Sequence, residues 1–184
     1  MSSARARSTF PPRSTGTVAS SWPTTAPTLP PPAGPAGWIE LARSPYGVAR
    51  HDEAARIIVM TRLPTPYPDF DTLEISFQRV ELTLAHLPRA RTALLIDARR
   101  APARNDAAFE QAFAPIRRRI IHGFRRVAVL VETAVGALQV TRHAKIDHEE
   151  VGTFTDPAHA LEYLEVQMDA HMIDLPDAAP SHHP

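Results

Sequence analysis

The chain has 184 residues, with 19 Pro, 7 Gly, no Cys and 20 basic residues against 20 acidic ones, a length that suits one domain with additional chain. The lack of Cys excludes disulfide bonds, thiolate metal sites and a Cys nucleophile, and no apolar run reaches the roughly 18 residues that a membrane-spanning helix needs. The formal net charge of zero gives the chain no overall attraction to nucleic acid or anionic lipid.

The chain begins with a segment that lacks the apolar residues needed for a core. Residues 1–37 hold eight Pro, six Ser, six Thr and three Arg but no acid, a composition that cannot offset the entropy of ordering a backbone. We therefore predict a disordered leader over 1–37, a folded domain over 38–172 and a disordered tail over 173–184. The Pro run at 30–32 favours polyproline II, which serves either as a stiff spacer or as a segment that docks on an aromatic groove.

The predicted domain opens with a hairpin and a helix. Residues 46–51 and 56–63 are two strand candidates, and the four residues between them are too few for a crossover helix, so they predict a hairpin. Asp71 can cap the helix that follows, with Glu74 three residues later. Apolar residues then recur at steps of three and four and place one stripe on one face of this helix: Leu73, Phe77, Val80, Leu84 and Leu87.

Two short apolar runs, 92–97 and 127–131, have the pattern of strands buried on both faces. Between them, Asn105 or Asp106 can cap a second long helix, which Pro115 should kink or split. The remaining signals are a short helix capped by Thr133, a strand over 151–155, and a final helix that starts at Asp156-Pro157 and carries Leu161, Leu164 and Met168.

These elements give the order β-β-α-β-α-β-α-β-α. Strands that alternate with helices predict an α/β fold, because parallel strands need crossover connections. We expect a mostly parallel sheet of about five strands, with an N-terminal antiparallel hairpin and flanking helices.

That order, together with the segments ALLIDARR, APARNDAAFEQAF and RRVAVLVET, resembles the STAS fold, specifically its SpoIIAA-like (STAS/SEC14-like) group, over about Tyr46 to Met168. In anti-sigma-factor antagonists of this family, a phosphorylatable Ser or Thr follows an Asp where the helix begins, and a partner kinase docks there. Here the corresponding residues are Asn105, Asp106, Ala107 and Ala108. Because none has a hydroxyl group, the phosphorylation switch does not carry over, and Asp106 at most supplies a fixed negative charge.

The loop between residues 97 and 106 is the strongest candidate for a binding site in the sequence. It follows a buried strand at the carboxyl edge of the sheet, where ligands of open α/β sheets gather, and it leads to a helix N-terminus whose N–H groups favour anions. We therefore predict an anion- or partner-binding site formed by Asp97, Arg99, Arg100, Arg104, Asn105 and Asp106. The alternatives are helix capping for Asn105 and Asp106, loop hydrogen bonds for Asp97, and solvated or salt-bridged guanidinium groups for the three arginines.

No nucleotide loop, nucleophile–base pair or metal-ligand spacing occurs in the sequence, and we expect neither a cofactor nor a metal. The leading interpretation is a non-enzymatic, cytoplasmic and bacterial regulatory or scaffolding module that binds another protein. The alternative, implied by SEC14-like relatives, is a domain that binds a small anion or a lipid, and an enzyme that uses Asp97 or Asp106 is a third hypothesis. We expect no binding to nucleic acid.

Overall fold

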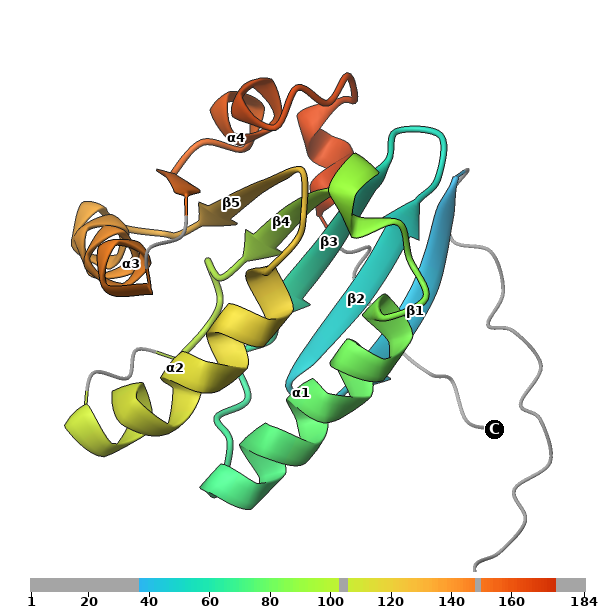
Figure 1. Cartoon of the computed structure of the whole chain (residues 1–184). Coiled ribbons are helices and arrows are strands. Elements are labelled where there is room, and N and C mark those ends of the chain that lie inside the picture. Colours follow the sequence, from blue (N-terminus) through green and yellow to red (C-terminus); the bar gives the residue numbers. More distant parts are fainter. Residues whose placement is uncertain (1–36, 103–105, 148–149, 175–184) are drawn as a thin grey trace, which may run out of the picture. The chain divides into compact units, whose positions relative to one another are not determined.

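The computed structural model of the chain describes residues 37–102, 106–147 and 150–174, which form an α/β domain around one six-stranded sheet (Figure 1). The strands are β1 (Trp38–Ser44), β2 (Gly47–Asp52), β3 (Ile57–Arg62), β4 (Ala93–Asp97), β5 (Arg126–Leu130) and β6 (Val151–Phe154). The helices are α1 (Phe70–Leu84), α2 (Ala107–Ile121), α3 (Ala134–Asp147) and α4 (Pro157–Tyr163), with two 3₁₀ turns, η1 (Arg89–Arg91) and η2 (Ala170–Ile173).

The strands pair in the order in which they occur in the chain. β1, β2 and β3 are antiparallel to one another, and β3 to β6 are parallel. The predicted fold class and the β2–β3 hairpin are therefore confirmed. The sheet has six strands because the segment Trp38–Ser44 adds β1 at its edge, with a break in register between Glu40 and Ala42.

The two faces of the sheet are buried by different elements. Adjacent residues of β3, Ile58 and Val59, point to opposite faces, and both are fully buried. α1 and α2 pack side by side on the face to which Ile58 points (Figure 1). They share this face because sequential right-handed crossovers place their helices on the same side of a sheet. The other face is covered by α4 and η2, whose buried side chains include Leu161 and Ile173.

Side chains of aspartate start three of the helices. Asp69 accepts from Thr72 N at 2.7 Å and caps α1, so the prediction that Asp71 is the cap was wrong by two residues. Asp106 caps α2 through Phe109 N at 2.9 Å, as one of the two predicted candidates. Asp156 caps α4 by accepting from two backbone amides, which confirms the predicted start at Asp156-Pro157.

Of the two outcomes expected at Pro115, a kink or a split, the split does not occur, because α2 is continuous from Ala107 to Ile121. Pro115 and Gln111 are both exposed, so the Gln111 carbonyl, which the proline leaves without its helical donor, faces water. α4 is shorter than predicted, because Glu165 adopts a left-handed conformation (φ 56°) just after the helix, and Met168 therefore packs on the core from beyond it.

The described chain extends to Asp174, into the segment predicted as a tail from residue 173. Ile173 is fully buried, and its carbonyl accepts a hydrogen bond from the guanidinium of Arg50, which is itself buried. The predicted leader lies outside the described residues except for Gly37, and so do residues 175–184 of the predicted tail.

Candidate functional site

The carboxyl edge of the sheet holds an ion pair rather than an open group of cations. Asp97 ends β4, is 4% exposed, and accepts from Arg99 through both carboxylate oxygens at 2.9 Å. Asp174 accepts from the same guanidinium at 2.7 Å. These hydrogen bonds, first of all the one to Asp97, raise the pKa of Arg99. Two carboxylates therefore neutralise this arginine and leave little of its charge for a ligand.

Two of the other predicted site residues, Arg100 and Asp106, are among the described residues. Arg100 is exposed in the turn after β4, and Asp106 caps α2. Arg104 and Asn105 lie outside the described residues. Among the four predicted site residues that the structure describes, Asp97 and Arg99 are joined by hydrogen bonds to each other.

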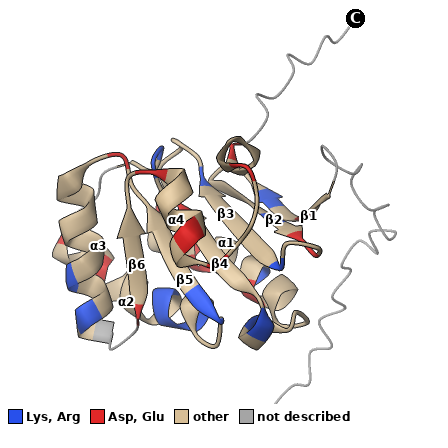
Figure 2. Ribbon diagram, turned by 90° about the horizontal axis from the view of Figure 1, so that it is seen from above, with Lys and Arg blue, Asp and Glu red and all other residues tan. Residues whose placement is uncertain are grey.

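A second basic group lies at the opposite, amino-terminal edge of the parallel strands. Arg56 directly precedes β3, Arg91 lies two residues before β4, and Arg125 directly precedes β5. The beginning of β5 and the loop before it carry basic residues in Figure 2. Since the amino ends of adjacent parallel strands meet at one edge, these arginines converge there. These arginines were not among the predicted site residues, although the sequence has an arginine before each of three apolar runs.

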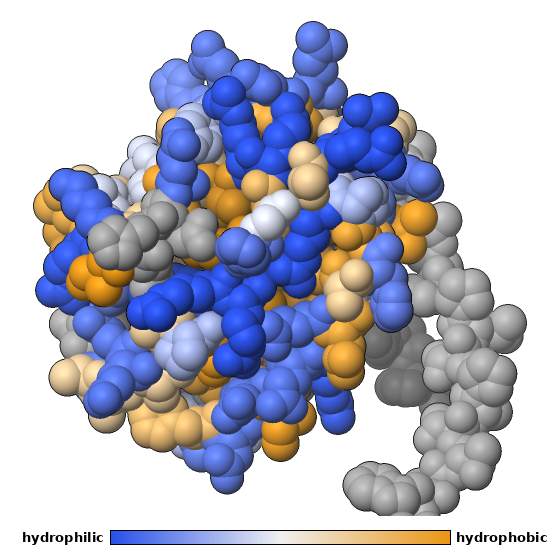
Figure 3. All heavy atoms as spheres, viewed as in Figure 1, coloured by the Kyte–Doolittle hydropathy of each residue, from blue (hydrophilic) through white to orange (hydrophobic). Residues whose placement is uncertain are grey.

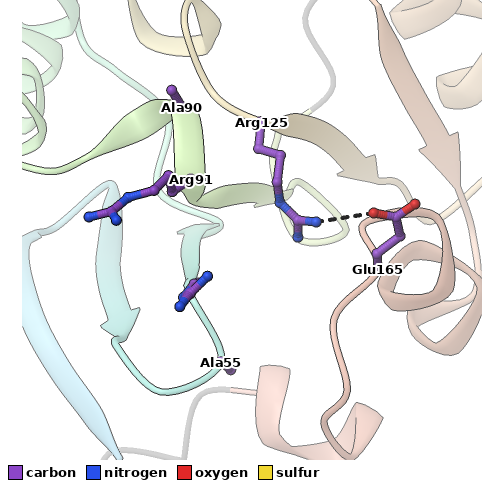
Figure 4. A pocket seen from close by; sticks show the side chains of 6 residues that line it. Ala55, Ala90, Arg91, Arg125 and Glu165 are labelled. Atoms are coloured by element: carbon purple, nitrogen blue, oxygen red, sulfur yellow. Dashed lines mark hydrogen bonds and ion pairs between the residues drawn. The ribbon is translucent and has the colours of Figure 1, made fainter.

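These three arginines line a pocket of about 280 Å³ together with Ala55, Ala90 and Glu165 (Figure 4). Arg125 turns to Glu165 and forms an ion pair at 3.1 Å, whereas Arg91 points away from that pair. Three guanidinium groups and one carboxylate give the pocket lining a formal charge of +2.

The arginines at this edge fall into two groups by their partners. Arg89 donates to carbonyl groups at the end of α2. Arg125 and Arg126 share Glu165 and donate to carbonyl groups at the end of α4. The guanidinium groups of Arg56 and Arg91 have no hydrogen-bond or ion-pair partner among the described residues, whereas the backbone of both residues is hydrogen-bonded. Among the arginines named at this edge, these two therefore offer guanidinium groups that the described chain does not itself occupy.

A larger groove of about 540 Å³ adjoins the pocket, and Arg56 and Arg91 line both. Its walls come from β1, from the β2–β3 hairpin and from the segment after α1. Four of the nine lining residues are apolar, and the others besides the two arginines are a histidine, a glutamate and a threonine: Ile39, Leu41, Leu87, Pro88, His51, Glu53 and Thr92.

Buried His51 should make the free energy of unfolding depend on pH. Burial lowers the pKa of His51 despite the opposing charges of Glu53 and Asp52. Below about pH 6.5 the unfolded chain therefore takes up a proton at His51 more readily than the folded chain does. We expect the free energy of unfolding to fall between pH 7 and pH 5 by more in the wild type than in His51→Gln. Urea titrations at both pH values measure this difference, and equal falls in the two proteins would contradict it.

The outer face of α3 is the other unusual surface. Val135, Leu138 and Ile146 are 75%, 72% and 60% exposed, and Ala144 is the only buried residue of this helix among those described. At 100° per residue, the three apolar side chains and Arg142 lie within about 80° of one another. Figure 3 shows hydrophobic side chains among hydrophilic ones on the side of the molecule where α3 lies.

No group of three or more His, Asp or Glu able to hold a metal ion occurs among residues 37–102, 106–147 and 150–174. Within the same ranges, no helix is long and apolar enough to cross a membrane. A scan against protein-family models and searches of curated proteins and of solved structures found no match for this chain.

Proposed function

We propose that this protein is a non-enzymatic regulatory or scaffolding module, similar to a STAS domain, that binds another protein through the outer face of α3. The observation that carries the proposal is the exposed row formed by Val135, Leu138 and Ile146. Contiguous apolar groups on a surface are typical of interaction sites, whereas single exposed apolar residues are common and need no explanation.

The chemistry of this face defines the partner that fits it. Arg142 lies within the apolar row and is held in place by Glu110 of α2, with both carboxylate oxygens about 3 Å from its guanidinium (3.1 and 3.0 Å). Lys145 is exposed beside the row in the last turn. Because Glu110 already neutralises Arg142, the charge left for a partner is that of Lys145. A partner that presents an apolar ridge with a carboxylate at its border would match the row and this lysine, since charged rims orient an interface around its apolar centre.

The order of the sheet is compatible with the STAS resemblance, since an antiparallel hairpin leads into parallel strands that are added one after another. The start of α2 differs from the phosphorylated members of that family, because Asp106 occupies the helix cap and no hydroxyl group follows it. We therefore place the partner-binding surface on α3 rather than at the start of α2.

Leu138→Asp tests this proposal, because it puts a charge in the centre of the apolar row without touching the core. We expect the tagged full chain to lose its stoichiometric partner on purification from its native cells, with the free energy of unfolding changed by no more than about 0.5 kcal/mol. The matched control is Leu82→Asp on α1, where Leu82 is 70% exposed. The same partner should remain bound to Leu82→Asp, and its loss from both variants or from neither would contradict the proposal.

A second candidate function is the binding of a small anion, and the observation that favours it is the pair of guanidinium groups on Arg56 and Arg91. Both line the pocket at the amino edge and have no partner among the described residues. This candidate moves the anion site from the predicted carboxyl edge, where Asp97 and Asp174 neutralise Arg99.

A further inference from the structure

We propose that the amino edge of the sheet binds a small amphipathic anion, in which one phosphate or carboxylate group is attached to an apolar chain or ring. The proposal deepens the second candidate function and rests on it. The anionic group would lie between Arg56 and Arg91, and the apolar part would fill the groove beside them.

The position of Arg56 and Arg91 indicates where the anionic group would bind. Both side chains line the 280 Å³ pocket and also the 540 Å³ groove, so they lie where the two hollows meet. A guanidinium group presents a planar set of donors that fits the oxygens of a phosphate or carboxylate. The remaining charges of the pocket are Arg125 and Glu165, which pair with each other, so the site keeps an excess of positive charge.

The lining of the groove indicates that the ligand also has an apolar part. Ile39, Leu41, Leu87 and Pro88 form an apolar wall next to the two guanidinium groups. An anion alone would leave this wall exposed to water, whereas an attached apolar group would bury it, and burial of apolar area favours binding. Glu53 also lines the groove and would repel a second anionic group there, which favours a ligand with a single charged end.

The backbone at Arg56 supplies a variant that separates binding from folding. Arg56 has φ 52°, in the left-handed region that glycine adopts without strain. Arg56→Gly therefore removes the guanidinium while it suits the local backbone. We combine it with Arg91→Gln, since Arg91 is exposed and makes no contact on which the described fold depends. The control is Arg100→Gln, which removes an exposed arginine at the opposite edge of the sheet.

The experiment is a calorimetric titration of the full chain with octyl phosphate, inorganic phosphate and octanol. We expect octyl phosphate to bind at least about tenfold more tightly than either of the others, and its affinity to fall as salt is added. Binding should weaken about tenfold or more in Arg56→Gly/Arg91→Gln and stay unchanged in Arg100→Gln. Glu165→Gly removes the carboxylate at a second left-handed position (φ 56°) and should bind about threefold more tightly, because the negative charge that pairs with Arg125 is gone.

The outcomes separate the two proposals. Inorganic phosphate bound as tightly as octyl phosphate, and lost in the double variant, would overturn the amphipathic ligand and leave the anion-binding function standing. Octanol bound as tightly as octyl phosphate would overturn the role of the arginines. If neither phosphate binds, or if the double variant binds as the wild type does, both the site and the second candidate function fail. Unchanged or weaker binding in Glu165→Gly would also count against the site.

Discussion

Replacing Trp38 with Ala is expected to lower the free energy of unfolding by about 3 to 5 kcal/mol, the cost of removing a large aromatic side chain from a core. Trp38 is 2% exposed and belongs to the cluster that α4 and η2 cover. Its ring also lies under the guanidinium of buried Arg50, 4.8 Å from the ring centroid. The variant therefore leaves both a cavity and an arginine without its aromatic support, and equilibrium unfolding in urea measures the loss.

Two controls decide what the loss means. Ile39→Ala, at a half-exposed neighbour on the same strand, should cost less than about 1 kcal/mol. Trp38→Phe keeps an aromatic ring and removes an indole N–H that is buried without a hydrogen-bond partner among the described residues, so it should cost well under half as much as Trp38→Ala. If Trp38→Ala costs no more than Ile39→Ala, β1 does not belong to the core.

The second large effect is expected at Leu95, in the middle of β4. Leu95 is fully buried between neighbouring strands and the elements after β6, so Leu95→Ala should lower the free energy of unfolding by about 2 to 5 kcal/mol. Val129→Ala, on β5, removes less volume from a residue that is 8% exposed and should cost less. Leu138→Ala, on the exposed face of α3, should change stability by less than about 0.5 kcal/mol. Equal costs at Leu95 and Leu138 would contradict the central position of β4.

The elements that could be predicted from the sequence are those with strong local signals. The apolar runs predicted at 92–97 and 127–131 correspond to β4 and β5, which are buried on both faces apart from the half-buried Ile96 and Arg126. Such runs identify central parallel strands without knowledge of their neighbours. β1 lacks a clear alternation, since its exposed and half-exposed residues follow one another and its register breaks after Glu40. Its assignment depends on pairing with β2 and on contacts made by Ile173, more than a hundred residues later.

The candidate site was harder to predict, because an arginine can be neutralised by a carboxylate that lies far away in the sequence. The sequence places Arg99 and Arg100 in a loop at the carboxyl edge, but it does not reveal that Asp174, 75 residues further along, returns to neutralise Arg99. At the amino edge, the sequence likewise does not reveal which arginines are paired and which remain available to a ligand. Arg89 and Arg125 are occupied by carbonyl groups and Glu165, whereas Arg56 and Arg91 are left without described partners. Composition gives the number of arginines, and only the fold determines which of them can meet a ligand.

Site-specific photo-crosslinking in the native cells tests most directly whether α3 is the partner-binding surface. A photoreactive amino acid is placed at position 138 of the full chain and, in a matched control protein, at position 82. Both positions are exposed apolar residues of helices, so they share background reactivity. We expect one discrete covalent adduct with a partner chain from position 138 and none from position 82. No adduct at position 138, or the same adducts from both positions, would contradict the assignment of α3 as the partner-binding surface.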